Sequence, residues 1–131
     1  MTSTTDTASS AVAIATLGTV VLDCADPLAL AGFYAQITGL PIDPGSEASW
    51  AQIEFPGGIG VAFQQITDYV TPTWPGGEHP QQFHLDFFLA DLDDGERKVL
   101  ALGATKDEHQ PGTTFRVFRD PEGHPFCLCQ S

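Results

Sequence analysis

The sequence predicts an α+β fold in which two tandem βαβββ modules form a curved, partly open mixed β-sheet barrel with the helices outside. The main observation is a repeat with a period of about 65 residues. Asp26 and Asp91 hold equivalent places before a helical segment, and Gly39 and Gly103 hold equivalent places after it. A single unit of this kind cannot cover both faces of its own sheet, so two paired units explain the repeat.

In the first module, alternating apolar residues predict a strand over residues 17–24 and further strands over residues 50–55 and 59–65. Asp26 and Pro27 are typical of a helix start, because Asp caps free N–H groups and Pro suits the first helical position. Gly39 is expected to end this helix. Residues 41–49 hold a short strand at most.

In the second module, the stretch from Phe83 to Asp91 predicts a strand, and the acidic residues after it predict a helix that stops at Gly103. Three strands follow, over residues 104–108, 113–119 and 125–130. We therefore expect a flexible N-terminal tail over residues 1–15 and one domain over residues 16–131. Within it, module one covers about 16–66, a Pro- and Gly-rich connector covers about 67–81, and module two covers about 82–131.

Composition restricts the function classes. Seventeen acidic residues against five basic ones give a formal net charge of −12, which argues against nucleic acids and anionic membrane surfaces as partners. No apolar run reaches the roughly 20 residues of a membrane span. The three cysteines lack an export signal beside them, so reduced thiols and a cytoplasmic location are expected.

The strand from Phe83 to Asp91 carries the first functional indication. Its polar side presents His84, Asp86 and Phe88, a mixture better suited to a lined cavity than to bulk water. Extending the alternation to the other strands predicts an inner face with apolar walls and a few polar groups, as in a small-molecule pocket. The candidate residues on this face are Thr19, Trp50, Gln52, Glu54, Gln64, His84, Asp86, Phe88 and Cys127, with Arg116 and Phe118 added on a less regular alternation.

Several motifs carry a resemblance to a known family. They are Asp23-Cys-Ala-Asp-Pro27, Phe33-Tyr34, Ala62-Phe-Gln64, Phe83-His-Leu-Asp86, Leu102-Gly-Ala104 and Asp120-Pro-Glu-Gly-His-Pro-Phe-Cys-Leu128. Together they resemble glyoxalase-like domain proteins of the vicinal oxygen chelate superfamily, which includes glyoxalase I, extradiol dioxygenases and the fosfomycin and bleomycin resistance proteins. The resemblance covers roughly residues 17–129. It implies the fold more specifically than the reaction, since this scaffold hosts many chemistries.

Metal-using members of that superfamily place one ligand on each of four strands, at positions that correspond to Thr19, Gln64, His84 and Cys127. Only His84 is a usual ligand type. The resemblance therefore implies that no cofactor is needed, with a divalent ion on His84, Gln64 and Cys127 as the less favoured alternative.

Two functions remain open at this point. The first is an enzyme of the lyase, isomerase or cyclase type, in which His84, Asp86 and Glu54 are acid–base groups. The second is a binding protein that sequesters a hydrophobic or aromatic compound, as bleomycin-resistance-type relatives do. In both, Gln64, Trp50, Gln52, Phe88, Arg116, Phe118, Thr19 and Cys127 are the expected ligand contacts, and a homodimer is the expected assembly.

Overall fold

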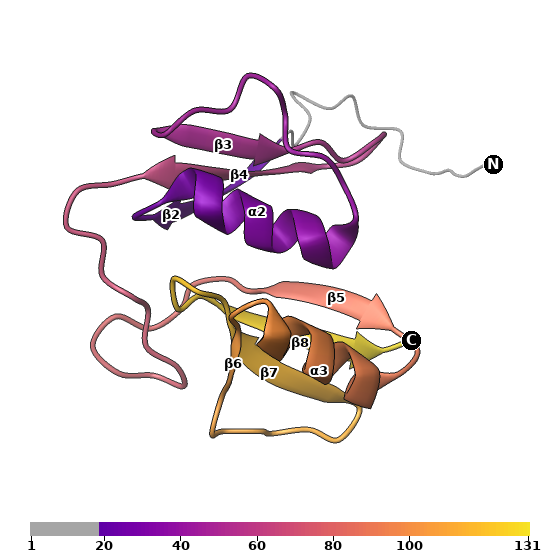
Figure 1. Cartoon of the computed structure of the whole chain (residues 1–131). Helices are drawn as coiled ribbons and strands as arrows, with labels where there is room; N and C mark the ends of the chain where they lie inside the picture. The colour runs from indigo at the N-terminus through magenta and orange to yellow at the C-terminus, as the bar shows by residue number, and fades with distance from the viewer. Residues whose placement is uncertain (1–18) are drawn as a thin grey trace, which may run out of the picture.

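The computed structural model describes residues 19–131, and the predicted tail and the first residues of the predicted domain lie outside this range. The elements fall into two groups joined by a long connector (Figure 1). The first group contains β2 (Thr19–Cys24), α2 (Pro27–Thr38), β3 (Trp50–Ile53) and β4 (Gly60–Gln65). The second contains β5 (Leu85–Leu89), α3 (Leu92–Ala101), β6 (Thr105–Lys106), β7 (Phe115–Arg119) and β8 (Pro125–Gln130).

The two groups share one topology. Their sheets have the orders β2-β4-β3 and β5-β8-β7-β6. In each, the first strand pairs in parallel with the last, and the remaining pairs are antiparallel. The first group's extra strand is reduced to a single bridge between Ile42 and Ile53. The predicted α+β class is thus confirmed, and the two sheets remain unclosed, as in a partly open barrel.

Both helices begin where the sequence predicts. The Asp26 carboxylate accepts a hydrogen bond from the Ala29 backbone N–H at 3.2 Å, and Pro27 fills the first position of α2. Gly39 ends α2 in the left-handed conformation, with φ of 73°, which costs little for a residue without a Cβ atom. The Asp91 carboxylate caps α3 in the same way, by accepting from the Asp94 N–H at 3.1 Å.

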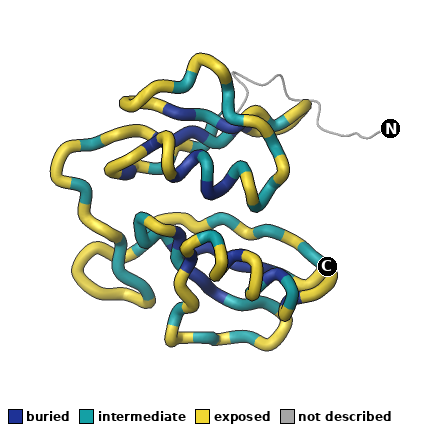
Figure 2. Tube along the Cα trace, in the orientation of Figure 1, coloured by how far each residue is buried: buried dark blue, intermediate teal, exposed yellow. Residues whose placement is uncertain are grey.

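The core lies where the two groups meet, and α2 contributes to both. The Tyr34 ring stacks on Phe63 of the first sheet at a centroid distance of 5.6 Å, and on Phe87 of the second sheet at 5.9 Å. Phe126 of β8 packs edge-on against Phe33 and Tyr34. Figure 2 shows this buried region along α2 and the strands beside it. No helix in residues 19–131 has the length and apolar character needed to cross a membrane.

A polar network joins the β7–β8 turn to the first group. Asp120 is only 3% exposed, and its carboxylate accepts from the Tyr34 hydroxyl at 2.7 Å. The same carboxylate lies 2.7 Å from Nδ1 of His124, whose Nε2 lies 2.6 Å from the Asp23 carbonyl oxygen. Because these contacts connect β2, α2 and the β7–β8 turn, the network fixes the two groups against each other.

The connector is held to the second sheet by Arg119. Its guanidinium donates to the carbonyl oxygens of Pro72 and Trp74 at 3.0 and 2.9 Å, and it pairs with the Asp107 carboxylate at 2.9 Å. The connector therefore has a fixed place beside β7.

Candidate functional site

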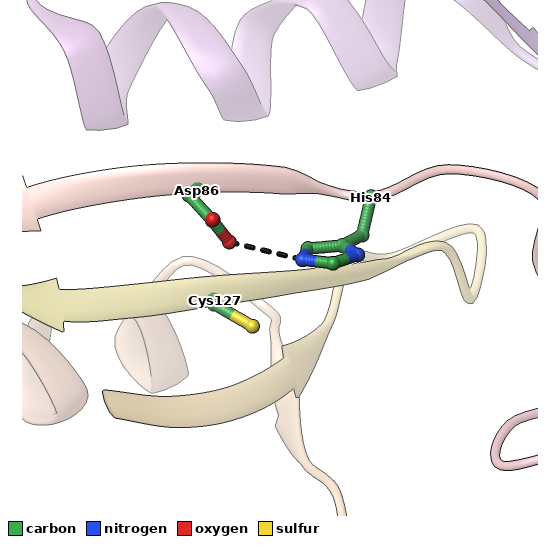
Figure 3. A group of neighbouring side chains, drawn as sticks. All are labelled: His84, Asp86 and Cys127. Carbon is green, nitrogen blue, oxygen red and sulfur yellow. Dashed lines mark ion pairs between the residues drawn. The ribbon is translucent and has the colours of Figure 1, made fainter. Parts of the chain in front are cut away.

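The site is centred on three side chains that β5 and β8 bring together: His84, Asp86 and Cys127 (Figure 3). Asp86 and Cys127 are opposite each other in the parallel β5–β8 pair, so their side chains share one face. His84 lies one residue before β5 begins, rather than inside the strand as the sequence suggested. Its Nε2 lies 3.1 Å from Oδ1 of Asp86, and both side chains are a little over 40% exposed.

The three side chains line a cavity of about 350 Å³, called here the inner hollow. Its other walls are mostly apolar or aromatic, with Gln81 as a polar exception, and come from the connector, the segment before β7, and strands β7 and β8. They are formed by Trp74, Gln81, Pro111, Phe115, Val117, Pro125 and Cys129. A few polar groups among apolar walls are the usual composition of a small-molecule pocket.

A second cavity, called here the interstrand slot, adjoins the inner hollow. It has a volume of about 280 Å³ and lies between residues 20–23 of β2 and residues 83–85 at the start of β5. His84, Gln81 and Pro125 line both cavities. The imidazole of His84 is thus placed where the two cavities meet.

The Cys127 thiol is chemically quiet. Its burial, together with the negative charge of Asp86, raises its pKa to about 12. A thiol with this pKa stays protonated near neutral pH and is a poor nucleophile. Its position in the wall therefore fits a packing role better than a catalytic one.

His84 has the opposite character. Its Nε2 faces the Asp86 carboxylate, while its Nδ1 makes no hydrogen bond to any residue in the range 19–131. A carboxylate close to one ring nitrogen favours a proton on that nitrogen and leaves the other nitrogen able to accept one. The pair can therefore act as an oriented base at the hollow.

Two predicted ligand contacts point the other way, which corrects the sequence analysis. Arg116 and Phe118 are paired with Leu128 and Phe126 and face α3, not the inner face. The Arg116 guanidinium pairs with Glu96 and Asp93 of α3 at 3.0 and 2.8 Å, and Phe118 is fully buried. The alternation in β7 was assigned with the wrong parity, so Phe115 and Val117, which do line the hollow, were missed.

The remaining candidates do not line the inner hollow, and all of them except Phe88 lie on the first sheet or next to it. Trp50 and Gln64 are register partners on one face of that sheet, Gln52 is opposite Ala62, and Thr19 is opposite Gly60. Glu54 lines a separate cavity of about 370 Å³ with Pro41 and Phe55. Phe88 is on the same face of β5 as Asp86 and is 71% exposed, but it lies outside the hollow's lining.

The possible metal ligands in the inner hollow differ from the set that the family resemblance implies. Gln64 is on the other sheet, so a ligand set that includes it is not assembled in the inner hollow. The ligand atoms of His84, Asp86 and Cys127 lie within 4.8 Å of one another. One nitrogen, one oxygen and one sulfur donor fit Zn²⁺ with a fourth position left for water or ligand, provided that the thiol loses its proton. The three residues therefore fit a borderline-soft ion better than Mg²⁺.

Fold and site together define an α+β protein with a mostly apolar small-molecule cavity on the inner face of its second sheet. Residues 19–129 match the family model described as a glyoxalase-like domain. The chain therefore belongs to the glyoxalase-like family of the vicinal oxygen chelate superfamily, as the sequence motifs predicted.

Solved structures agree with this assignment at the level of the fold. A glyoxalase/bleomycin resistance protein/dioxygenase family enzyme from Burkholderia phytofirmans PsJN has a TM-score of 0.68 and 18% identity, with 88% of this chain and 98% of that chain covered. A glyoxalase/bleomycin resistance protein from Albidiferax ferrireducens T118 has a TM-score of 0.61 and 21% identity, covering 87% and 97%. The oxidase ChaP-H2 has a TM-score of 0.62 and 21% identity, covering 91% and 95%. No curated protein matches the sequence.

Proposed function

We propose that the protein is a metal-independent enzyme of the lyase, isomerase or cyclase type, in which His84 transfers a proton on a small molecule bound in the inner hollow. The observation that carries this proposal is the oriented His84–Asp86 pair, 3.1 Å apart, at the wall of a mostly apolar cavity. Reactions of these three types share a proton transfer next to a carbonyl or leaving group, which an imidazole supports near neutral pH.

The mechanism assigns one step to each residue. Nδ1 of His84 accepts a proton from an acidic C–H of the ligand, and the imidazolium that forms is paired with the Asp86 carboxylate. The imidazolium then returns the proton to another atom of the same ligand or to its leaving group, which restores the starting state. Apolar walls such as Phe115 and Val117 hold the ligand and keep bulk water from the reacting carbon.

Replacement of three of the four family metal positions by Thr19, Gln64 and Cys127 supports metal independence. If a divalent ion binds, His84, Asp86 and Cys127 would hold it, and it would polarise a ligand oxygen as a Lewis acid. Glu54 has no part in this mechanism, because it lines a different cavity.

The test is hydrogen–deuterium exchange at the carbon next to the carbonyl of 2-hydroxyacetophenone in D₂O, followed by NMR. We expect the wild type to accelerate exchange, His84→Gln to abolish the acceleration, and Asp86→Asn to lower it by roughly 10- to 100-fold. His79→Gln is the matched control, since His79 is exposed on the connector. Acceleration that vanishes in EDTA and returns with Zn²⁺ would contradict metal independence, and acceleration that survives His84→Gln would contradict the assigned base.

Sequestration of a hydrophobic or aromatic compound is the alternative, and the dominance of apolar and aromatic walls in the hollow favours it. A binding protein predicts no exchange, and it predicts that Phe115→Ala weakens affinity for an aromatic probe more than His84→Gln does. We also propose a homodimer, supported by exposed apolar residues such as Phe83 and Phe88, which are 81% and 71% exposed. Light scattering that gives the mass of one chain at micromolar concentration would contradict it.

A further inference from the structure

The charges around the inner hollow indicate which ligands it accepts. We propose that it selects molecules with a protonated amine on an aromatic or apolar body, and that it rejects anions of the same shape. This inference rests on the proposed function, because it assumes that the inner hollow is the binding site. It adds the charge of the ligand, which the proposed function leaves open.

The basic side chains of the chain are already neutralised by ion pairs. The chain has five Lys and Arg residues, and all five pair with carboxylates. Asp94 pairs with Arg97 and Lys98, Glu96 pairs with Lys106 and Arg116, and Asp107 pairs with Arg119. None of the five lines the inner hollow. An anionic ligand would therefore enter without a free guanidinium or ammonium group to balance its charge.

Asp86 is placed to contact a cationic ligand. Its side chain is 44% exposed at the hollow, with its Oδ1 near His84 and the Cys127 thiol beside it. Carboxylate oxygens accept more than one hydrogen bond each, so this exposed carboxylate can also accept one from an ammonium group. His84 does not reverse the local charge, because a protonated imidazole here would be matched by the same carboxylate.

The aromatic walls of the hollow also favour a cation. Trp74 lines the hollow on the connector, and Phe115 lines it on β7. Aromatic faces attract cations through their negative quadrupole, and they also bury apolar bodies. A carboxylate or phosphate ligand would gain from neither the walls nor Asp86. The net charge of −12 favours cations over anions at longer range as well.

The test uses three probes that share an indole ring: tryptamine as the cation, tryptophol as the neutral compound and indole-3-propionate as the anion. Binding is followed at pH 7 and low salt by ¹H–¹⁵N NMR shifts of residues 84–88 and 126–129. We expect tryptamine to bind roughly 3- to 10-fold more tightly than tryptophol, as for a partly exposed ion pair with an aromatic contribution. Indole-3-propionate should bind more weakly than tryptophol.

Asp86→Asn should bring tryptamine and tryptophol to similar affinity by weakening the binding of tryptamine. Glu108→Gln is the matched control, because it removes one negative charge from an exposed loop and should keep the preference for tryptamine. Equal binding of the three probes to the wild type, or a preference that survives Asp86→Asn, would overturn the charge selectivity but leave the inner hollow as the site. Absence of shifts at residues 84–88 with every probe would overturn the site itself.

Discussion

At the scale of single residues, the surroundings of the inner hollow give His84 and Cys127 different reactivities. His84 and Cys127 both have side chains able to attack or take up a proton. Burial and the nearby Asp86 charge raise the pKa of the Cys127 thiol to about 12, whereas the same carboxylate orients the imidazole of His84. Burial, helped by the charge of Asp86, therefore keeps the thiol protonated, while the same carboxylate lies beside the imidazole of His84.

This difference predicts slow alkylation of Cys127. The pKa of its thiol rises from 9.0 to about 12, so the reactive thiolate is roughly a thousandfold rarer than in the unfolded chain near pH 7.5. Cys24 shares this behaviour, since burial raises its pKa to about 12 as well. With iodoacetamide and mass spectrometry, we expect Cys129, which is partly exposed, to react first. All three thiols should react rapidly in urea, and fast native labelling of Cys127 would contradict the assignment.

The sequence predicts the residues of the site only in part, for reasons that concern particular strands. Strand alternation correctly placed Asp86 and Cys127 on one face, because β5 and β8 are regular and pair in register. It failed for β7, where Arg116 was expected to face inward. The missed signal was the pair of acids Asp93 and Glu96, three residues apart on one side of α3, which provide partners for a basic residue beneath the helix.

At the scale of elements, the connector forms a wall of the site although it has no regular secondary structure. Trp74 lines the inner hollow and Pro72 lines the interstrand slot. Arg119 donates to the backbone carbonyl oxygens of both residues. Composition identified the connector as a loop but could not reveal that a β7 side chain anchors it, since this contact spans more than 40 residues.

Arg119→Gln should therefore loosen the connector without unfolding the sheets. The variant loses the ion pair with Asp107 and the fork of N–H groups that reaches two carbonyl oxygens. We expect faster amide hydrogen exchange in residues 70–82 and roughly 5- to 30-fold weaker binding of an indole probe, as for the loss of about one to two kcal/mol of ordering. Arg97→Gln is the control, because Arg97 pairs with Asp94 on exposed α3, away from the connector. Unchanged exchange in residues 70–82 would show that Arg119 is not the anchor.

The β7–β8 turn introduces a pH-dependent contribution to stability. Burial by itself would lower the pKa of His124, but the hydrogen bond and charge of Asp120, together with the Asp23 carbonyl, raise it above its usual value. A group whose folded pKa is raised binds its proton more tightly when folded. Its stabilisation is therefore complete below about pH 6.5, the ordinary value for histidine, and is lost as pH rises through the folded pKa.

We expect the free energy of unfolding of the wild type to fall as pH rises above 6.5, and His124→Asn to flatten this dependence. Asparagine can still donate to Asp120 but does not titrate. Urea denaturation between pH 6 and 7.5 measures the effect below the range in which unfolded thiols lose most of their protons. Identical slopes for the two proteins in this range would show that His124 does not carry the pH dependence.

At the scale of the whole molecule, the two βαβββ units are not independent, because α2 is packed between their strands. Tyr34 stacks on one ring from each sheet, and Phe126 of the second sheet contacts Phe33 and Tyr34 of α2. The repeat in the sequence predicted the two units and their helices. It could not predict that α2 packs against both sheets, because nothing in the repeat marks Phe33 and Tyr34 as contacts of the second unit.

A shared core predicts that both units unfold in one transition. Phe126 is fully buried, and its ring lies 5.8–6.0 Å from those of Phe33, Tyr34, Phe87 and Phe118. Phe126→Ala should therefore lower the free energy of unfolding by about 3–5 kcal/mol. Leu100→Ala, on the exposed side of α3, is the control and should change it by less than about 1 kcal/mol.

Fluorescence of Trp50 in a Trp74→Phe background reports on the first sheet, and amide exchange of β7 and β8 reports on the second. In Phe126→Ala, both signals should shift to the same lower urea midpoint. The removed ring packs against α2 of the first unit and against strands of the second, so its loss weakens both units together. Two separate midpoints, with the Trp50 signal unchanged, would mean that the first unit keeps its fold alone. In that case α2 would stabilise only its own sheet, and the packing of Tyr34 on Phe87 would contribute little to stability.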